Sequence, residues 1–242
     1  MRKLSKNLVP FAAGLIALSF GCAKFPQTGD NLLTKRLVFT AKLSGKVRTG
    51  LTGGQQPYIY VFALRLSTDA NPRDRGPVPV TSFGGNGFVA GNCTHYVVFN
   101  PGSTNPYEIW QFQDTQLNNR FQTGVAINFE DPRGGGRPNI LKFEIDMSQL
   151  VPAADVNSIQ SVQCNILTMD RLALSSSGHD WDAFGDGNIV SQDNTFLTFQ
   201  TKSTRTISNT QTQLEPSSED VRGSNDPDLD LRDWSVEIRL QQ

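Results

Sequence analysis

The segment GHDWDAFGDGN, from Gly178 to Asn188, gathers residues that could bind a metal ion. It holds three aspartates, Asp180, Asp182 and Asp186, beside glycines that let the backbone turn its carbonyls inward. Clustered carboxylate and carbonyl oxygens are the ligands that calcium prefers. The spacing departs from the EF-hand pattern, because Phe184 stands where an oxygen ligand is needed and no glutamate closes the loop. The two interpretations are a calcium site and aspartates that only accept hydrogen bonds from nearby backbone amides.

The same loop offers two residues, His179 and Trp181, that could contact an organic ligand. Trp181 lies among aspartates and glycines, so it is the first tryptophan to consider as a platform for a sugar ring. Its alternative role is to pin the loop against the rest of the domain. Four further aromatic residues could stack on a sugar: Trp110, Trp234, Tyr58 and Tyr107. Of these, Trp110 and Trp234 alternate with apolar residues, which predicts that both belong to the core.

Two other acidic stretches could attract a cation. In LSTDANPRDRGP, the side chains of Asp69, Asn71 and Asp74 form the alternative calcium site, although Asp, Asn and Pro are also ordinary turn residues. In DPDLDLRD, three aspartates alternate along an extended segment and are expected to be solvated: Asp226, Asp228 and Asp230.

The sequence contains no recognisable catalytic motif. Its two histidines are His179 and His95, which sits in a strand-like segment and is expected to be structural, and no G-x-S-x-G nucleophile motif occurs. Met147 and Met169 also lie in strand-like segments and are expected in the core. The prediction is therefore a non-enzymatic binding protein. One alternative is a glycoside hydrolase that uses scattered carboxylates: Glu108, Glu130 and Glu144.

The candidate site residues are expected on strands or on the loops between them, because apolar side chains alternate with period two along many short segments. Residues 37–43 and 234–240 each have one apolar face, whereas residues 58–66 are apolar on both faces and read as a strand covered on both sides. Gly- and Pro-rich turns separate the segments, and the polar stretch 203–228 reads as an exposed hairpin or a long loop. This pattern predicts an all-β fold, a single antiparallel β-sandwich of jelly-roll or immunoglobulin-like type.

The N-terminus has the composition of an export signal. Arg2, Lys3 and Lys6 precede an apolar run, Leu8 to Phe20, that is too short to span a bilayer. The end of the run, LSFGC, resembles the lipobox of bacterial lipoproteins, in which a small residue precedes a cysteine that becomes lipidated. The resemblance implies cleavage before Cys22 and a lipid on that residue. The alternative is an ordinary signal peptide with an incidental cysteine.

We therefore expect a signal peptide at residues 1–21, a tether at 22–34 and a β-sandwich domain at 35–242. Loss of the signal changes the formal charge from −1 to −4, because that segment has three basic and no acidic residues. A mildly acidic domain argues against nucleic acid as a partner. The lipid would hold the protein outside the cytoplasm, on the bacterial cell envelope, at the outer membrane or the cell surface.

The two cysteines of the predicted domain, Cys93 and Cys164, could form a disulfide in an oxidising compartment. Their spacing does not show whether their Cα atoms approach. Cys164 lies in an apolar strand pattern, where a free thiol behaves as a small buried hydrophobic residue.

The acidic turn at residues 66–77 and the terminal segment DLDLRDWSVEIRL resemble features of DOMON-type sandwiches and of family-nine carbohydrate-binding modules. The resemblance implies a ligand-binding β-sandwich for sugar or haem, and neither ligand is assigned to particular residues here. We expect a lipoprotein whose domain binds a ligand, with carbohydrate as the candidate. The second alternative, beside the hydrolase, is a structural or assembly protein that contacts another envelope protein.

Overall fold

Alternating burial along the strands builds the two faces of each sheet. The computed structural model describes residues 34–50, 54–134, 136–185, 195–216 and 219–241, which all belong to one compact unit. In β14 (Leu231–Gln241), Trp234, Val236 and Ile238 are buried while the residues between them are partly exposed. The predicted one-sided strand is confirmed at this position.

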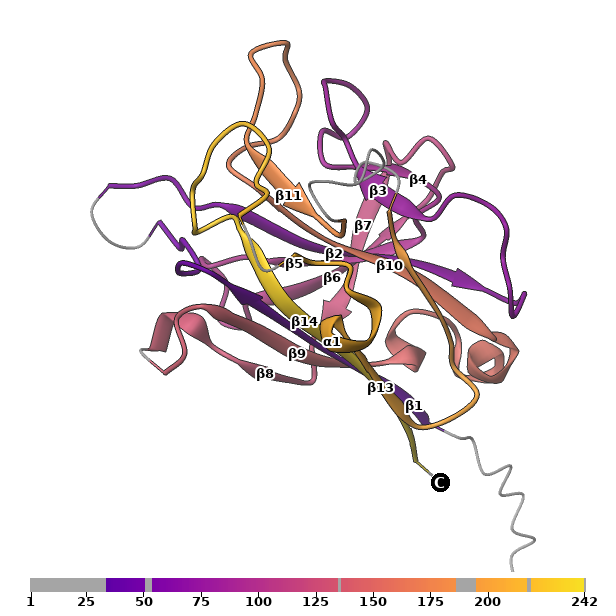
Figure 1. Cartoon of the computed structure of the whole chain (residues 1–242). Coiled ribbons are helices and arrows are strands. Elements are labelled where there is room, and N and C mark those ends of the chain that lie inside the picture. Colours follow the sequence, from indigo (N-terminus) through magenta and orange to yellow (C-terminus); the bar gives the residue numbers. More distant parts are fainter. Residues whose placement is uncertain (1–33, 51–53, 135, 186–194, 217–218, 242) are drawn as a thin grey trace, which may run out of the picture. The chain divides into compact units, whose positions relative to one another are not determined.

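The described residues form two larger antiparallel sheets (Figure 1). The five-stranded sheet has the order β13-β14-β1-β9-β8, and the seven-stranded sheet has the order β11-β10-β2-β5-β6-β7, with β12 also paired to β10. A separate hairpin pairs β3 with β4. The bounds of the other strands are β1 (Thr34–Leu43), β2 (Ile59–Ser67), β3 (Pro77–Pro79), β4 (Val89–Gly91), β5 (His95–Phe99), β6 (Tyr107–Phe112), β7 (Arg120–Val125), β8 (Asn128–Glu130), β9 (Ile140–Asp146), β10 (Ser161–Met169), β11 (Trp181–Ala183), β12 (Leu197–Gln200) and β13 (Arg205–Ser208).

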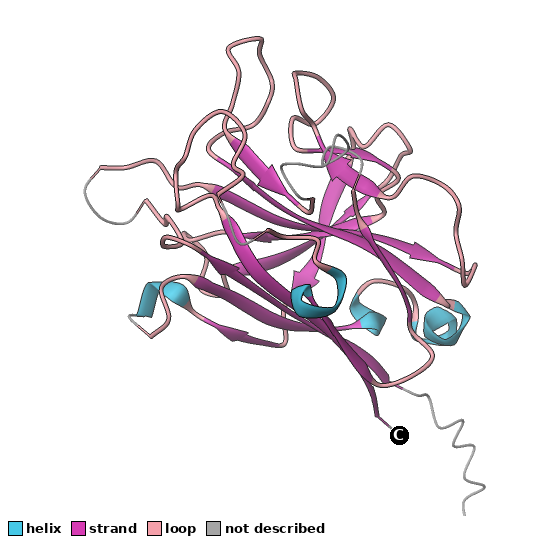
Figure 2. Ribbon diagram, viewed as in Figure 1, coloured by secondary structure: helices cyan, strands magenta, loops and turns pink. Residues whose placement is uncertain are grey.

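Helical segments in the described residues are short, with at most six residues each (Figure 2). They are η1 (Pro132–Gly134), η2 (Met147–Gln149), η3 (Ala153–Ser158) and α1 (Asn209–Thr212). None of the helices in this part of the chain is long and apolar enough to cross a membrane. The all-β antiparallel sandwich predicted from the alternation is confirmed.

The main core fills the space between the two sheets. Phe39 and Phe143 of the five-stranded sheet stack with ring centroids 5.3 Å apart, and Phe62 of the seven-stranded sheet meets Phe143 edge-on at 4.7 Å. The predicted two-sided burial of β2 is also confirmed. Phe62 belongs to this inner core, whereas Val61 and Ala63 belong to a second apolar cluster on the outer face of the same sheet. Met147 lies in the inner core and Met169 in the outer cluster, as expected.

The two cysteines are free thiols, so the disulfide considered between them is absent. Cys164 points into the core between the sheets, whereas Cys93 packs in the outer cluster. The seven-stranded sheet therefore separates the two sulfur atoms. Burial raises the pKa of Cys93 to about 12 and also raises the pKa of Cys164, so both thiols stay protonated.

The ends of the described chain meet at one end of the sandwich. Thr34, where β1 begins, pairs with Gln241 at the end of β14. The β3–β4 hairpin loop and the loop between β10 and β11 project from the opposite end (Figure 1). Two backbone hydrogen bonds join these loops, from Gly84 N–H to the Ala173 carbonyl at 3.1 Å and from Ala173 N–H to the Gly87 carbonyl at 2.7 Å.

Candidate functional site

A groove of about 330 Å³ opens on the outer face of the seven-stranded sheet. Its floor comes from β2 and β5, and one side comes from β6 and β7. Phe88, just before β4, and Leu172, just after β10, also line it. The aromatic and polar residues that line the groove are Tyr58, Phe88, Tyr96, Phe99, Asn100, Glu108, Trp110 and Arg120.

Two aromatic rings lie parallel in the groove because their strands pair in register. Tyr96 of β5 is the Cα partner of Trp110 of β6, and their rings are 7° from parallel with centroids 6.2 Å apart. Tyr96 is buried, whereas Trp110 is only partly buried. Trp110 is therefore the member of the pair that can contact a ligand.

Polar groups surround this aromatic pair. Glu108 accepts a hydrogen bond from the Asn100 amide at 2.8 Å and one from the Trp110 indole N–H at 3.3 Å. The guanidinium of the exposed Arg120 lies 5.2 Å from the centre of the Phe88 ring. The groove thus combines apolar ring faces with one anionic, one cationic and one amide group, which together can donate and accept hydrogen bonds.

Tyr58 adds a phenol at the end of the groove. Its hydroxyl donates to Asp226 at 2.6 Å, and burial together with this hydrogen bond raises its pKa to about 12. Burial also raises the pKa of Tyr96. Both phenols are therefore neutral near pH 7, so they add no negative charge to the groove.

The tryptophan expected to face a ligand is instead a buried residue. Trp181 lies in β11, packs in the outer apolar cluster and pairs through its backbone with Arg222. His179 is partly buried beside it, with ring centroids 6.4 Å apart, and burial lowers the pKa of His179. These contacts fit the alternative role of Trp181, in which the tryptophan pins its loop against the rest of the domain.

Trp110, which was expected in the core, is only partly buried and packs against the edge of the outer apolar cluster. Trp234 is buried as expected, and Tyr107, considered as a platform for a sugar, is buried as well. Alternation places Glu108 and Trp110 on one face of β6, with Tyr107 and Ile109 on the other. A charged residue two positions from a tryptophan indicates that the tryptophan shares a partly solvated face. That signal was present in the sequence.

The predicted aspartate loop contributes one residue to a different acidic group. Carboxylate oxygens of Asp182, Glu215 and Asp220 lie within 4.8 Å of one another. We name these three residues the carboxylate cluster. Asp180 is outside it, with its carboxylate against Gly223, and Asp186 lies outside the described residues.

Glu215 and Asp220 were missed because they belong to the polar stretch 203–228, which was expected to be exposed. This stretch instead contains β13 and α1 and places the Glu215 side chain in the interior. A glutamate next to Leu214 in a Ser- and Thr-rich segment was the only local hint.

The alternative calcium turn uses its side chains for protein contacts. Asp69 accepts a hydrogen bond from the Asn71 amide at 2.9 Å, as in an Asx turn. Asp74 forms an ion pair with Arg65 at 2.7 Å, and the Asn71 side chain accepts a bond from Gln200 at 3.4 Å. These contacts give the three residues local structural roles.

The prediction that the alternating aspartates are solvated was wrong. Arg48 forms ion pairs with Asp226 at 3.0 Å and with Asp228 at 2.8 Å, and its guanidinium lies 4.0 Å from the centre of the Tyr58 ring. Asp230 is fully buried. The sequence pattern did not show that an arginine more than a hundred residues away would neutralise the first two carboxylates.

The three glutamates considered for a hydrolase belong to different surroundings. Glu108 lies in the groove, on the seven-stranded sheet. Glu130 pairs with Lys142 and Arg137, and Glu144 pairs with Arg36 and Arg239, both on the five-stranded sheet.

His95 is buried beside Thr94, whose Oγ1 is 3.0 Å from its Nδ1. Burial lowers the pKa of His95 to about 4. The histidine is therefore neutral at pH 7, in agreement with a structural role.

Two features of the described residues thus offer ligand chemistry, the aromatic groove on the outer face of the seven-stranded sheet and the carboxylate cluster beside β11. Comparison of the chain with family models, curated proteins and solved structures gave no match.

Proposed function

We propose that this chain is a cell-envelope lipoprotein whose β-sandwich binds an uncharged glycan in the aromatic groove. The observation that carries the proposal is the partly exposed Trp110, which lies parallel to Tyr96 and next to Glu108. Sugar rings present apolar C–H faces and a rim of hydroxyl groups. A flat aromatic face bordered by hydrogen-bonding groups matches both features.

The polar groups of the groove favour an uncharged ligand. Glu108 can accept hydrogen bonds from sugar hydroxyls, and Arg120 can donate them. Because the two charges are opposite, an acidic or a basic sugar would gain from one side chain and be repelled by the other. Glu108 is already oriented by Asn100 and Trp110, which lowers the entropy cost of binding.

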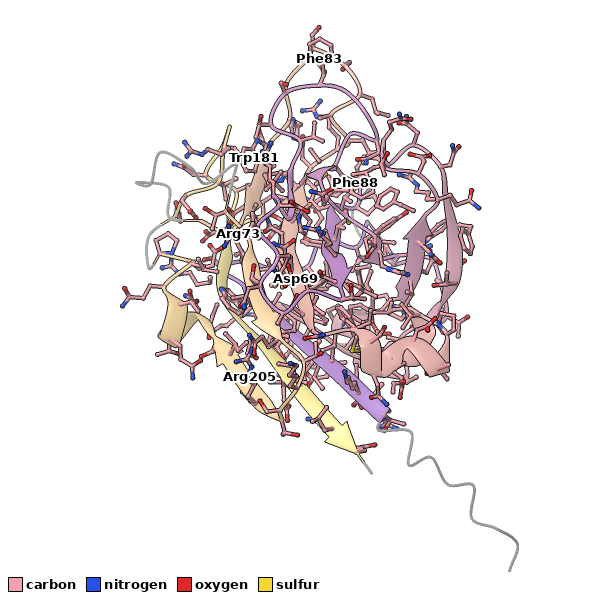
Figure 3. The ribbon with its side chains drawn as sticks, turned by 90° about the vertical axis from the view of Figure 1, so that its right-hand side faces the viewer. Asp69, Arg73, Phe83, Phe88, Trp181 and Arg205 are labelled. Carbon is pink, nitrogen blue, oxygen red and sulfur yellow. The ribbon has the colours of Figure 1, made fainter. Side chains whose placement is uncertain are left out.

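A glycan array with the purified protein tests the proposal, followed by titration of each bound glycan. Trp110→Ala should weaken binding at least about fivefold, the equivalent of about 1 kcal/mol for one aromatic contact. Phe83→Ala is the matched control, because Phe83 is 62% exposed at a loop tip outside the groove (Figure 3). An array without bound glycans, or equal affinities for the wild type and Trp110→Ala, would refute glycan binding in the groove.

The lipid anchor is tested separately. Mass spectrometry of the mature N-terminus should find a lipid on Cys22, and Cys22→Ala should move the protein from the membrane to the soluble fraction. Cys93→Ala is the control, because this cysteine is buried in the domain. An unmodified N-terminus at another residue would disprove the anchor.

A role in envelope assembly is the second candidate, supported by the two joined loops. Phe83 and Leu174 are each 62% exposed in these loops, and apolar side chains at adjacent loop tips favour contact with a protein partner. The double variant Phe83→Ser, Leu174→Ser should abolish cross-linking to that partner and leave glycan binding intact. Cross-linking that is unchanged in the double variant would reject this role.

A further inference from the structure

The carboxylate cluster joins three distant parts of the chain. Asp182 comes from β11, Glu215 follows α1, and Asp220 lies five residues further along. A fourth carboxylate, Asp230, lies just before β14 and is close enough for its charge to act on Asp182 and Glu215. The cluster itself would carry a formal charge of −3 with all three groups ionised.

Glu215 provides an observation that is independent of the clustering. Glu215 is only 4% exposed, and neither of its carboxylate oxygens has a hydrogen-bond partner among the described residues. The backbone N–H of Gly185, which lies near this carboxylate, donates its hydrogen bond to the Leu214 carbonyl at 2.8 Å. A buried carboxyl group without partners costs free energy in either protonation state, because a protonated carboxyl also needs an acceptor.

Asp230 repeats this observation. Its side chain is 1% exposed, and its Oδ1 has no hydrogen-bond partner among the described residues. Its Oδ2 accepts a hydrogen bond from Ser44 and lies 3.9 Å from the Arg232 guanidinium.

Asp182 is oriented in a way that favours its anionic form. Its two oxygens accept backbone N–H groups, one from Ala183 and one from Leu231, each at 2.8 Å. Donated N–H groups stabilise a carboxylate, and each oxygen keeps a lone pair for another ligand. Burial, followed by the charge of Asp220, opposes this and raises the pKa of Asp182, while burial and the charge of Asp182 raise the pKa of Glu215. A cation among these oxygens would remove that conflict.

The donor set and its size indicate which cation fits. All three donors are carboxylate oxygens, which suit hard cations, whereas structural zinc sites are built mainly from cysteine sulfur and histidine nitrogen. Calcium binds oxygen at about 2.3–2.6 Å, so two ligands on opposite sides of the ion are about 4.6–5.2 Å apart. Oxygens that all lie within 4.8 Å of one another can therefore contact one calcium ion together.

We propose that Asp182, Glu215 and Asp220 bind one Ca²⁺ ion, with Asp230 as a neighbouring anionic group. The ion reduces the formal charge of the cluster from −3 to −1. It connects β11 to the segment after α1, and through the Asp182–Leu231 hydrogen bond it also supports the start of β14. The site differs from the predicted set of Asp180, Asp182 and Asp186, because its second and third ligands come from the segment that follows α1.

The direct test measures calcium binding and thermal unfolding of the full chain. Isothermal titration calorimetry with CaCl₂ should show one site per chain after treatment with a chelator. Calcium at about 100 times its Kd should raise Tm by about 5–10 °C relative to excess chelator, because an unfolded chain cannot hold the ligands together. MgCl₂ should give a smaller shift, since magnesium keeps several of its waters.

Variants of nearly equal shape locate the site. Glu215→Gln should lose the calcium-dependent shift, but in chelator it should be at least as stable as the wild type, because it removes one buried charge. The double variant that combines Asp182→Asn with Glu215→Gln should lose the calcium-dependent shift and also the heat of calcium binding measured by calorimetry at 20 °C. Asp180→Asn is the matched control from the same loop and should keep both signals.

Three outcomes would overturn the proposal. The first is an absence of binding heat together with equal midpoints for the wild type in calcium and chelator. The second is a shift that persists in both cluster variants, which would place the ion elsewhere. The third is loss of the shift in Asp180→Asn with retention in Glu215→Gln, which would favour the set first predicted from the sequence.

Discussion

Arg48 connects two loops of the sandwich, and its removal should have a measurable cost. Its guanidinium pairs with Asp226 and Asp228, donates to the Tyr58 hydroxyl and lies over the Tyr58 ring. The variant Arg48→Met keeps much of the apolar stem but removes these polar contacts. Two carboxylates would then remain close together without their shared cation.

The expected loss is about 2–3 kcal/mol of unfolding free energy at pH 7. Each hydrogen bond to a charged group contributes about 1.5–3 kcal/mol. The sum is discounted because the side chains of Arg48 and both aspartates are 22–23% exposed, which lets water compensate in part. At about 2–4 °C per kcal/mol for a domain of this size, Tm should fall by about 4–12 °C.

The effect of Arg48→Met should depend on pH. Burial raises the pKa of Asp226, but hydrogen bonds from Tyr58 and the Asp228 amide, with the charge of Arg48, outweigh it and leave the pKa below its usual value. A carboxyl group with a lowered folded pKa stabilises the protein above its unfolded pKa of about 3.9, and this contribution disappears as pH falls through the folded value. The difference between the wild type and Arg48→Met should therefore shrink below about pH 4.

Urea denaturation at pH 7, and at the lowest pH where both proteins remain folded, measures this difference. Arg48→Lys should lose about half as much stability as Arg48→Met, because an ammonium keeps the charge but not the forked geometry. Arg73→Met is the control, since Arg73 is exposed and makes no ion pair with a described residue, and it should change stability by less than about 0.5 kcal/mol. An Arg48→Met cost that is independent of pH, or no larger than that of Arg73→Met, would refute the electrostatic account.

Two further substitutions test the backbone and the buried histidine. Gly91→Ala should destabilise the protein by at least about 2 kcal/mol more than Gly54→Ala in urea denaturation. Both glycines have positive φ, but a Cβ on Gly91 would lie 2.2 Å from the Gly76 carbonyl oxygen, whereas a Cβ on Gly54 would meet nothing within 4 Å. Equal losses of unfolding free energy in the two variants would contradict this steric argument. His95→Gln should flatten the loss of stability between pH 6.5 and 4, because the unfolded chain protonates this histidine near pH 6.5 and the folded protein only near 4. Over this pH range, the unfolding free energy of His95→Gln should fall by up to about 3 kcal/mol less than that of the wild type. Parallel pH profiles of stability for the wild type and His95→Gln would show that His95 does not cause the loss.

Local alternation in the sequence was sufficient to predict the longer strands, but not the short strands β11 and β13. In β14 and β2 the side chains change face at every residue, so the burial of Trp234 and the two-sided burial of β2 follow from neighbouring residues alone. The same alternation also indicates that Trp110 is partly exposed, since Glu108 lies on the same face of β6. The expectation that Trp110 belongs to the core did not take this glutamate into account.

The carboxylate cluster could not be predicted by such a local rule. Asp182 meets Glu215 and Asp220 because β11 pairs with β10 while the segment after α1 folds back beside it. Sequence composition suggested an exposed segment, since Ser, Thr and Asp surround Glu215. Which polar residue becomes buried depends on the packing of segments that are remote in sequence.

The pairing of β1 with β14 affects when the domain can fold. β14 lies between β13 and β1 in the five-stranded sheet, and its register with β1 runs from Thr34 opposite Gln241 to Leu43 opposite Leu231. Strand β1 therefore has no permanent partner on this side until residues 231–241 have been synthesised. Contacts between such distant residues slow folding, because a long loop must close before they form.

A five-stranded sheet with this strand order cannot be completed before β14 has been synthesised. Until that point the exposed edge of β1 is available to any other strand that it meets, including the same strand of another copy. Removal of residues 231–241 would leave β13 without its partner and would expose one edge of β1, the central strand of the five-stranded sheet. The pairing of β14 with both neighbours thus completes this sheet.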